Sequence, residues 1–152
     1  MMIDIAFFCI LAAVGWIDQR TMEIPDRLSS AVLLLAVADQ LTGGGPALFS
    51  SVLGTCAVSV PMLLMTLAIP GAFGGGDIKL MAACGAFLGW RLALEAFFLA
   101  VLGGGVWGCW LLVSGKAGRK DHFAFGPFLC TGAAVSYLWG EKLLSWYLSL
   151  LP

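Results

Sequence analysis

The chain has 152 residues, of which 61% are hydrophobic and 11% are charged, whereas soluble domains carry charge on roughly a quarter of their positions. Together with a mean hydropathy of +0.98, this composition excludes a water-soluble globule. Eight Lys and Arg against nine Asp and Glu give a net charge of -1, so no basic excess exists to hold nucleic acid. We therefore expect a protein whose partners are the lipid bilayer, membrane-borne proteins or small molecules.

The apolar stretches predict an all-α, polytopic membrane protein with about six transmembrane helices in a single domain over residues 1–152. Six spans of about 20 residues leave only about 30 residues for connections and tails. The second and fourth stretches are short of that length, so they are the weakest predictions. The stretches run from about Ile3 to Ile17, Leu28 to Leu41, Ala47 to Ile69, Ile78 to Trp90, Leu92 to Val113 and Phe125 to Leu151.

The charges of the connections predict how these helices are oriented. With six crossings, residues 19–27, 70–79 and 114–123 share one face, and the positive-inside rule places that face in the cytoplasm. Both termini are then outside, and we interpret the first helix as retained because no basic region precedes it. Arg91 and Lys142 fall on the opposite face. The cytoplasmic face holds Arg20, Arg27, Lys79, Lys116, Arg119 and Lys120.

The cysteines and the histidine predict neither a metal site nor disulfides. The cysteines are dispersed through apolar runs, and their spacing fits neither a zinc site nor a disulfide framework. His122, the only histidine, lies in a polar loop. We expect no metal and no organic cofactor. The cysteines are Cys9, Cys56, Cys84, Cys109 and Cys130.

Two carboxylates lie where a membrane helix meets the same predicted face. Asp18 ends the first apolar run, and Asp77 follows three glycines, Gly74, Gly75 and Gly76. Each has a simple structural interpretation, Asp18 as a boundary residue and Asp77 as the N-cap of a helix beginning at Ile78. However, irregular backbone at membrane depth is tolerated where it lines a cavity or is covered by protein. The glycines therefore favour a functional site.

A pair of carboxylates in one watery cavity is sufficient to hydrolyse a peptide bond without a metal or a nucleophile. The ionised group takes a proton from water, while its protonated neighbour donates to the carbonyl oxygen or the leaving amine. A transporter or channel subunit, with Asp18 and Asp77 as ion or proton sites, is the alternative from another class.

Three segments resemble the type IV prepilin peptidases. Residues 18–26, DQRTMEIPD, are similar to the family segment D-x-x-T-x-x-[IL]-P-[ND]. Residues 73–80, FGGGDIKL, are similar to G-x-G-D-x-K-L, and residues 125–128 match an F-G-P-F element that opens the last helix. A G-x-G-D match alone is weak. Three elements in family order across six expected helices extend the resemblance over the whole chain.

The resemblance implies a membrane-embedded aspartic endopeptidase with Asp18 and Asp77 as its catalytic pair. Its substrates are then prepilins or pilin-like proteins, cut at the cytoplasmic face of the inner membrane between a basic leader and a hydrophobic stem. Lys79 is interpreted either as a group beside Asp77 and the substrate or as an interfacial anchor. The remaining candidates for the active-site loops and substrate binding are Gly74, Gly75, Gly76, Pro25, Gly126 and Pro127.

Many bacterial members carry an additional amino-terminal region with paired C-x-x-C motifs and methylate the new N-terminus. This chain resembles instead the short, peptidase-only members found with tight-adherence pili, so we expect no N-methyltransferase activity. A lipoprotein signal peptidase, which also uses two aspartates, is a second alternative. The sequence leaves open the pilus system, the scissile bond, the oligomeric state and the division of roles between the two aspartates.

Overall fold

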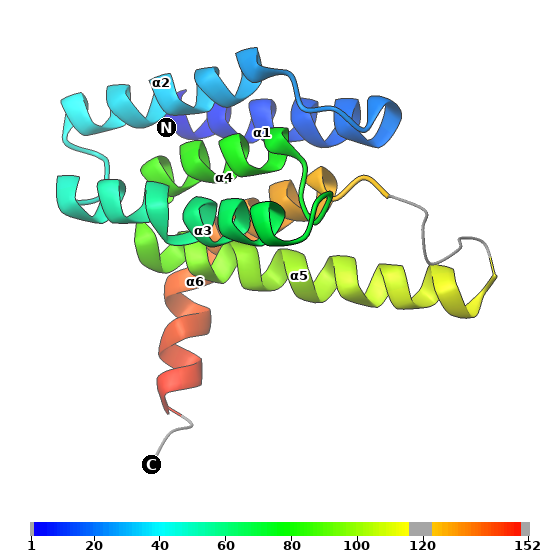
Figure 1. Ribbon diagram of the computed structural model, residues 1–152. Helices are drawn as coiled ribbons and strands as arrows, with labels where there is room; N and C mark the ends of the chain where they lie inside the picture. Colours follow the sequence, from blue (N-terminus) through cyan, green and yellow to red (C-terminus); the bar gives the residue numbers. More distant parts are fainter. Residues whose placement is uncertain (1, 116–122, 150–152) are drawn as a thin grey trace.

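The computed structural model describes residues 2–115 and 123–149, and in these ranges it is all-helical (Figure 1). The predicted fold class is confirmed, and each expected apolar stretch forms a helix. His122, Lys116, Arg119 and Lys120 lie outside the described residues. The helices are α1 (Met2–Thr21), α2 (Asp26–Thr42), α3 (Leu48–Ala68), α4 (Gly75–Leu88), α5 (Trp90–Val113) and α6 (Gly126–Ser149).

Three of the described helices, α1, α3 and α5, are long and apolar enough to cross a membrane. Large apolar side chains are exposed on their outer faces, including Phe49, Leu64 and Phe98. Water would penalise such surfaces, whereas lipid does not. As the sequence predicts, α2 and α4 are the shortest helices in the described residues, with 17 and 14 residues.

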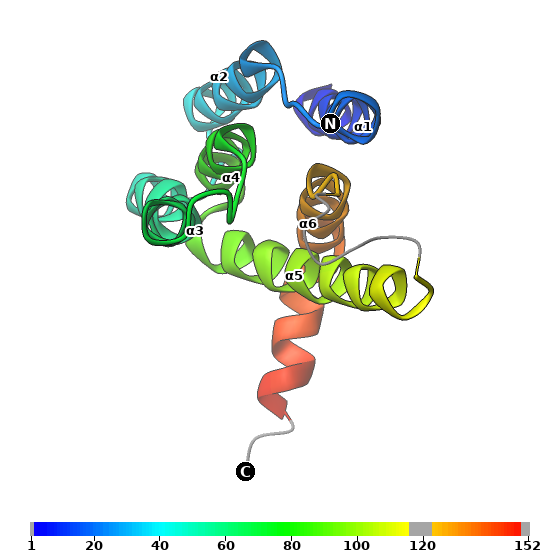
Figure 2. The ribbon, with the colours of Figure 1, turned by 45° about the vertical axis from the view of Figure 1, so that its right-hand side comes forward.

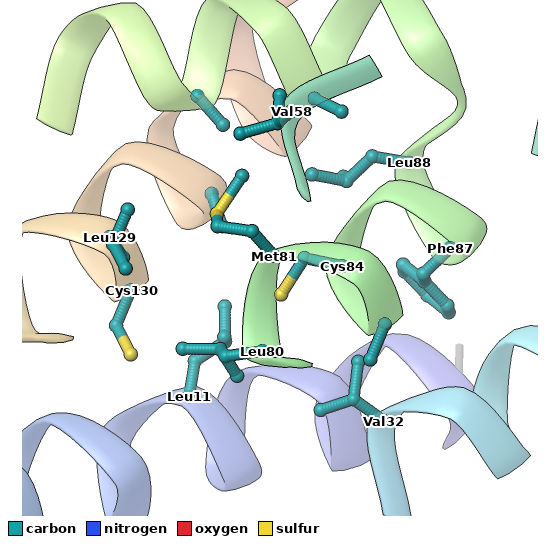
Figure 3. Close-up of a cluster of buried hydrophobic side chains, with 14 of the residues drawn as sticks. Leu11, Val32, Val58, Leu80, Met81, Cys84, Phe87, Leu88, Leu129 and Cys130 are labelled. Atoms are coloured by element: carbon teal, nitrogen blue, oxygen red, sulfur yellow. The ribbon is translucent and has the colours of Figure 1, made fainter. Parts of the chain in front are cut away.

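Helix α4 occupies the centre of the bundle, between α2, α3 and α6 (Figure 2). Its residues from Ala83 to Leu88 are all buried, as expected for a helix that is apolar on every side. Figure 3 shows its Met81 and Cys84 between Leu11 of α1, Val58 of α3 and Cys130 of α6. Helix α4 can be shorter than a membrane span because it is surrounded by protein instead of lipid.

Glycines bring α3 and α4 into backbone contact. A Cβ built on Gly85 would overlap the carbonyl of Gly54, and a Cβ built on Gly54 would overlap the carbonyl of Gly85. Small residues let membrane helices approach this closely. Directly after α4, Gly89 adopts a positive φ of 77°. This conformation, accessible to glycine at little cost, turns the chain straight into α5.

The first half of α6 lies between α1 and α5 (Figure 2). Gly132 packs against the backbone carbonyl of Ala96, and the Ser136 hydroxyl donates a hydrogen bond of 2.8 Å to the carbonyl of Leu92. Beyond Gly140 the helix leaves the bundle (Figure 1), and its described side chains are largely exposed. The amino-terminal half of α6 is therefore the part that contributes to the bundle interior.

Candidate active site

Asp18 lies in the last turn of α1 on the stripe that faces the bundle. The buried residues of α1 are Phe7, Leu11, Val14 and Asp18, a spacing that places all four on one side of a helix. The side chain of Asp18 is only 4% exposed. Its position on the apolar stripe therefore carries a carboxylate into the protein rather than toward lipid or water.

The buried carboxylate of Asp18 meets the beginning of α6. The Gly126 N–H donates a hydrogen bond of 2.9 Å to Asp18 Oδ2. The first N–H groups of a helix have no partner within that helix, and Gly126 is the first residue of α6. The positive end of the helix dipole also favours negative charge at this position. α6 thus supplies both a donor and a favourable field to Asp18.

Gly126 can be replaced by no other residue without displacing Asp18. A Cβ at Gly126 would stand 2.5 Å from Asp18 Oδ2 and 2.8 Å from Cγ. Pro127, the second residue of α6, has no N–H to compete for the same acceptor and favours the first turn of a helix. The expected role of Gly126 and Pro127 in starting the last helix agrees with their positions, and Gly126 also contacts the carboxylate directly.

Asp77 lies in the first turn of α4 and is 9% exposed. The expectation that it caps a helix beginning at Ile78 is wrong, because α4 begins at Gly75. Asp77 Oδ2 accepts a hydrogen bond of 3.3 Å from the N–H of Gly74, which lies three residues earlier in the chain and not in the following turn. Gly75 and Gly76 enter the first turn of the helix, while Gly74 stays extended. Asp77 is thereby held at the positive end of α4.

The two carboxylates are close enough to interact electrostatically. The charge of Asp18 acts on Asp77, and both charges act on Cys130 of α6. Three helices thus meet at the site: α1 carries Asp18, α4 carries Asp77, and α6 contributes Gly126 and Cys130. The site is a buried carboxylate pair at one end of the bundle.

The segment between α1 and α2 lies against the beginning of α4. A Cβ at Gly76 would stand 2.9 Å from the Cβ of Ile24 and 3.3 Å from its carbonyl oxygen, so Gly76 permits this approach. A Cβ built on Gly75 would have no atom within 4 Å. Lys79 Nζ lies 2.8 Å from both carboxylate oxygens of Asp26. The two sequence segments are therefore joined at their backbones and at their surface charges.

Thr21 and Met22 bring the chain out of α1 just beyond Asp18. The Thr21 hydroxyl donates to the carbonyl of Ile17 at 2.9 Å. Met22 adopts a φ of 53°, and its N–H donates to the carbonyl of Asp18 at 2.8 Å. The left-handed residue ends the helix and directs the following segment toward α4.

The remaining candidates have peripheral positions. Pro25 is the half-buried N-cap of α2, with φ of −62°. Lys79 is exposed and paired with Asp26, an arrangement that fits an interfacial anchor. Gly74 and Gly75 are exposed. The sequence alone predicts no role for Thr21, Ile24 or Asp26. All three lie in residues 18–26, and the resemblance of that segment to the family motif is the feature that points to them.

Among the described residues, no group of three or more His, Cys, Asp or Glu side chains has the geometry to hold a metal ion. Cys84 and Cys130 are buried in the apolar core, and the other three cysteines are exposed. At the site itself the structure places the two carboxylates and the backbone N–H groups of Gly74 and Gly126.

A model of the type IV leader peptidase family matches residues 5–109. This range contains Asp18 and Asp77 and ends before Gly126. Proteins named prepilin leader peptidase/N-methyltransferase are similar along nearly the whole chain. The protein from Bacillus subtilis (strain 168) is 29% identical over 146 residues, covering 96% of this chain and 59% of that protein.

The protein of the same name from Aeromonas salmonicida (strain A449) is 31% identical over 147 residues, covering 93% of this chain and 50% of the relative. That from Xanthomonas campestris pv. campestris is 31% identical over 150 residues, covering 95% of this chain and 52% of the relative. This chain thus spans about half the length of the curated relatives it matches. No solved structure matches it.

Proposed function

The chain belongs to the type IV leader peptidase family, and we propose that it is an aspartic endopeptidase that removes the leader from type IV prepilins or pilin-like proteins. The observation that carries this proposal is the convergence of Asp18 and Asp77, two buried and interacting carboxylates, at one end of a membrane helix bundle. The names of the relatives support the substrate class.

In the proposed reaction the two carboxylates share one proton. The ionised carboxylate takes a proton from water as the water oxygen attacks the scissile carbonyl carbon, and the carboxylic acid protonates the carbonyl oxygen. Proton transfer to the amide nitrogen then allows the C–N bond to break, which releases a carboxyl end and an amine end. Because the pair is largely withdrawn from water, the two groups hold the shared proton between them.

The distribution of charge over the bundle supports a location for this reaction. Arg20, Arg27 and Lys79 lie near the ends of α1, α2 and α4 at which the carboxylate pair is found. Arg91 lies near Asp4 and Glu141 at the opposite end. By the positive-inside rule we propose that the site faces the cytoplasm, in the inner membrane, with both termini outside. We treat residues 1–152 as one transmembrane domain.

The decisive experiment is a cleavage assay with purified enzyme in liposomes. A prepilin with a basic leader and an apolar stem should be cleaved, and a lipidated prolipoprotein should not. Asp18→Asn and Asp77→Asn should each lower the rate by at least about 100-fold, because an amide cannot exchange the proton on which general acid–base catalysis depends. Asp26→Asn is the matched control, since Asp26 is an exposed carboxylate of the same segment.

The outcomes separate the alternatives. Near-normal processing by either buried-aspartate variant, at normal expression and melting temperature, would show that the catalytic pair is assigned wrongly. Cleavage of the prolipoprotein instead of the prepilin would identify a lipoprotein signal peptidase. Ion flux without cleavage of either substrate would identify a transporter or channel.

For these 152 residues we propose peptidase activity alone. The relatives carry N-methyltransferase in their names, but each aligned relative extends well beyond the region that matches this chain. Mass spectrometry of the processed substrate, with a methyl donor supplied, should show an unmodified new N-terminus. The same reaction should continue in the presence of a chelator. Methylation with only this chain present, or inhibition reversed by added metal, would contradict this part of the proposal.

A further inference from the structure

An apolar groove runs along the seam between α1 and α6. Its volume is about 390 Å³, and α1 and α6 line it alone. On α1 it shares Leu11 with the buried stripe of that helix and extends from there to Ala12 and Gly15, which lie outside the stripe. The groove therefore lies beside the stripe that faces the bundle. Ala12 and Thr131 are exposed, so it opens toward the surroundings of the bundle.

We propose that this groove holds the apolar stem helix of the substrate, next to the bond that is cut. This inference rests on the proposed function and extends it from the reacting groups to substrate binding. It commits to one occupant, a transmembrane helix of the substrate.

The first argument is that one end of the groove lies next to the catalytic pair. Gln19 and Pro127 line the groove, and they directly follow Asp18 and Gly126, which are joined by a hydrogen bond. Cys130, which lies one turn after Gly126 on the same side of α6, also lines the groove. A helix lying in the groove would thus end beside the carboxylates.

The second argument is the shape and length of the groove. Ala12, Gly15 and Ala134 contribute little or no side chain, and small residues of this kind permit close approach of another helix. At the rise of an α-helix, the distance along α1 from Phe8 to Gln19 is about 16 Å. That length accommodates about three turns of a stem helix. Gln19 and Thr131 supply polar side chains to the groove. Gln19 lies at the end of the groove nearest the two aspartates.

The third argument is the substrate's own geometry. A stem that begins close to the scissile bond cannot leave the bilayer without exposing apolar residues to water. The stem must therefore lie against a lipid-facing surface of the enzyme that reaches the carboxylates. The groove reaches the residues next to Asp18 and Gly126, and it opens at the exposed Ala12 and Thr131.

Site-specific photocrosslinking tests this proposal. A benzophenone side chain replaces Phe8 or Trp16, two aromatic residues that already line the groove, in the Asp77→Asn background, and it replaces Leu34 or Val106 as controls. Leu34 and Val106 are 69% and 72% exposed on α2 and α5, so they sample lipid equally well but lie away from the groove. We expect adducts with the prepilin at Phe8 and Trp16, mapped to the first three turns of the stem, and at least tenfold less at the controls.

Filling the groove gives an independent measurement. Ala12→Phe and Thr131→Phe should raise the KM for full-length prepilin at least about tenfold, whereas Leu34→Phe should not. A short peptide that spans the cleavage junction but lacks the stem should be cleaved by all three at the wild-type rate, because the carboxylate pair is untouched. Loss of activity on both substrates, or an unchanged KM for prepilin, would overturn the proposal.

The crosslinking products separate the other occupants. Adducts with a second copy of the enzyme would identify the groove as a dimer interface, and adducts with lipid alone would identify it as a lipid-filled surface. Either result overturns substrate binding there but leaves the catalytic assignment intact. That assignment fails separately, through active Asp18→Asn or Asp77→Asn variants.

Discussion

Asp18 receives its hydrogen bond from a residue 108 positions away in the chain, the N–H of Gly126. Hydrogen bonds to a charged group contribute about 1.5–3 kcal/mol, and the donor here is fixed by the first turn of α6. A single backbone group therefore orients the carboxylate, and it does so only while position 126 carries no side chain.

We predict that Gly126→Ala lowers kcat/KM at least about tenfold, which corresponds to about 1.4 kcal/mol of transition-state stabilisation. The added Cβ would stand 2.5 Å from Asp18 Oδ2, so the carboxylate must rotate or α6 must move. The measurement is prepilin cleavage at matched enzyme concentration. Gly105→Ala is the control because no atom lies within 4 Å of a Cβ at that position. Equal rates for both variants would refute this role of Gly126.

Two of the glycines before Asp77, Gly75 and Gly76, should respond differently to the same substitution. Gly76→Ala should reduce activity several-fold, because its Cβ meets the Cβ of Ile24 at 2.9 Å, whereas Gly75→Ala should leave activity near wild type, because its Cβ meets nothing. Initial cleavage rates and the fraction of folded protein decide this prediction. A larger loss with Gly75→Ala would mean that flexibility of the loop, rather than its contact with Ile24, is what activity requires.

Between elements, the packing of α3 against α4 holds Asp77 in place. The two helices touch through the backbones of Gly54 and Gly85. No flexible side chain lies at this contact that could adjust if a larger residue were introduced. Because α4 also contacts α2 and α6, displacing it would move Asp77 relative to Asp18.

Accordingly, Gly85→Ala should destabilise the protein by at least about 1–3 kcal/mol, the range found for overpacked cores. Thermal unfolding in detergent should show a lower Tm than for Gly105→Ala, which adds the same methyl group on α5 where no atom lies within 4 Å. An unchanged Tm for Gly85→Ala would show that α3 and α4 separate easily. Activity should fall together with stability in this variant.

For the whole molecule, the orientation of the bundle in the membrane can be tested by labelling. Single cysteines replace Glu23 and Ala72 at the end with the site and Thr42 at the opposite end, all of them exposed, in a background without the native cysteines. An impermeant thiol reagent should reach Glu23 and Ala72 only from the cytoplasm and Thr42 only from outside, following the distribution of Lys and Arg. Labelling of Glu23 and Ala72 from opposite sides would contradict the proposed mechanism.

Hydropathy alone was sufficient to locate the helices, because each apolar stretch is a local property of the chain and lipid requires backbone hydrogen bonds to be satisfied within a segment. The stripe that places Asp18 on the inner side of α1 is equally local, since it follows from helical periodicity. The boundary of α4 was predicted less well. Gly75 and Gly76 are poor helix formers by themselves, yet both lie in its first turn.

The sequence by itself therefore determined the all-helical class, the approximate spans and the two aspartates as candidates. Only the tertiary structure decided what surrounds those aspartates: Gly126 against Asp18, Ile24 against Gly76, and Asp26 rather than Asp77 as the partner of Lys79. The physical reason is that helical periodicity and hydropathy act over a few residues. Contacts between distant segments depend instead on how closely whole helices pack, which at this site is set by where glycine leaves room.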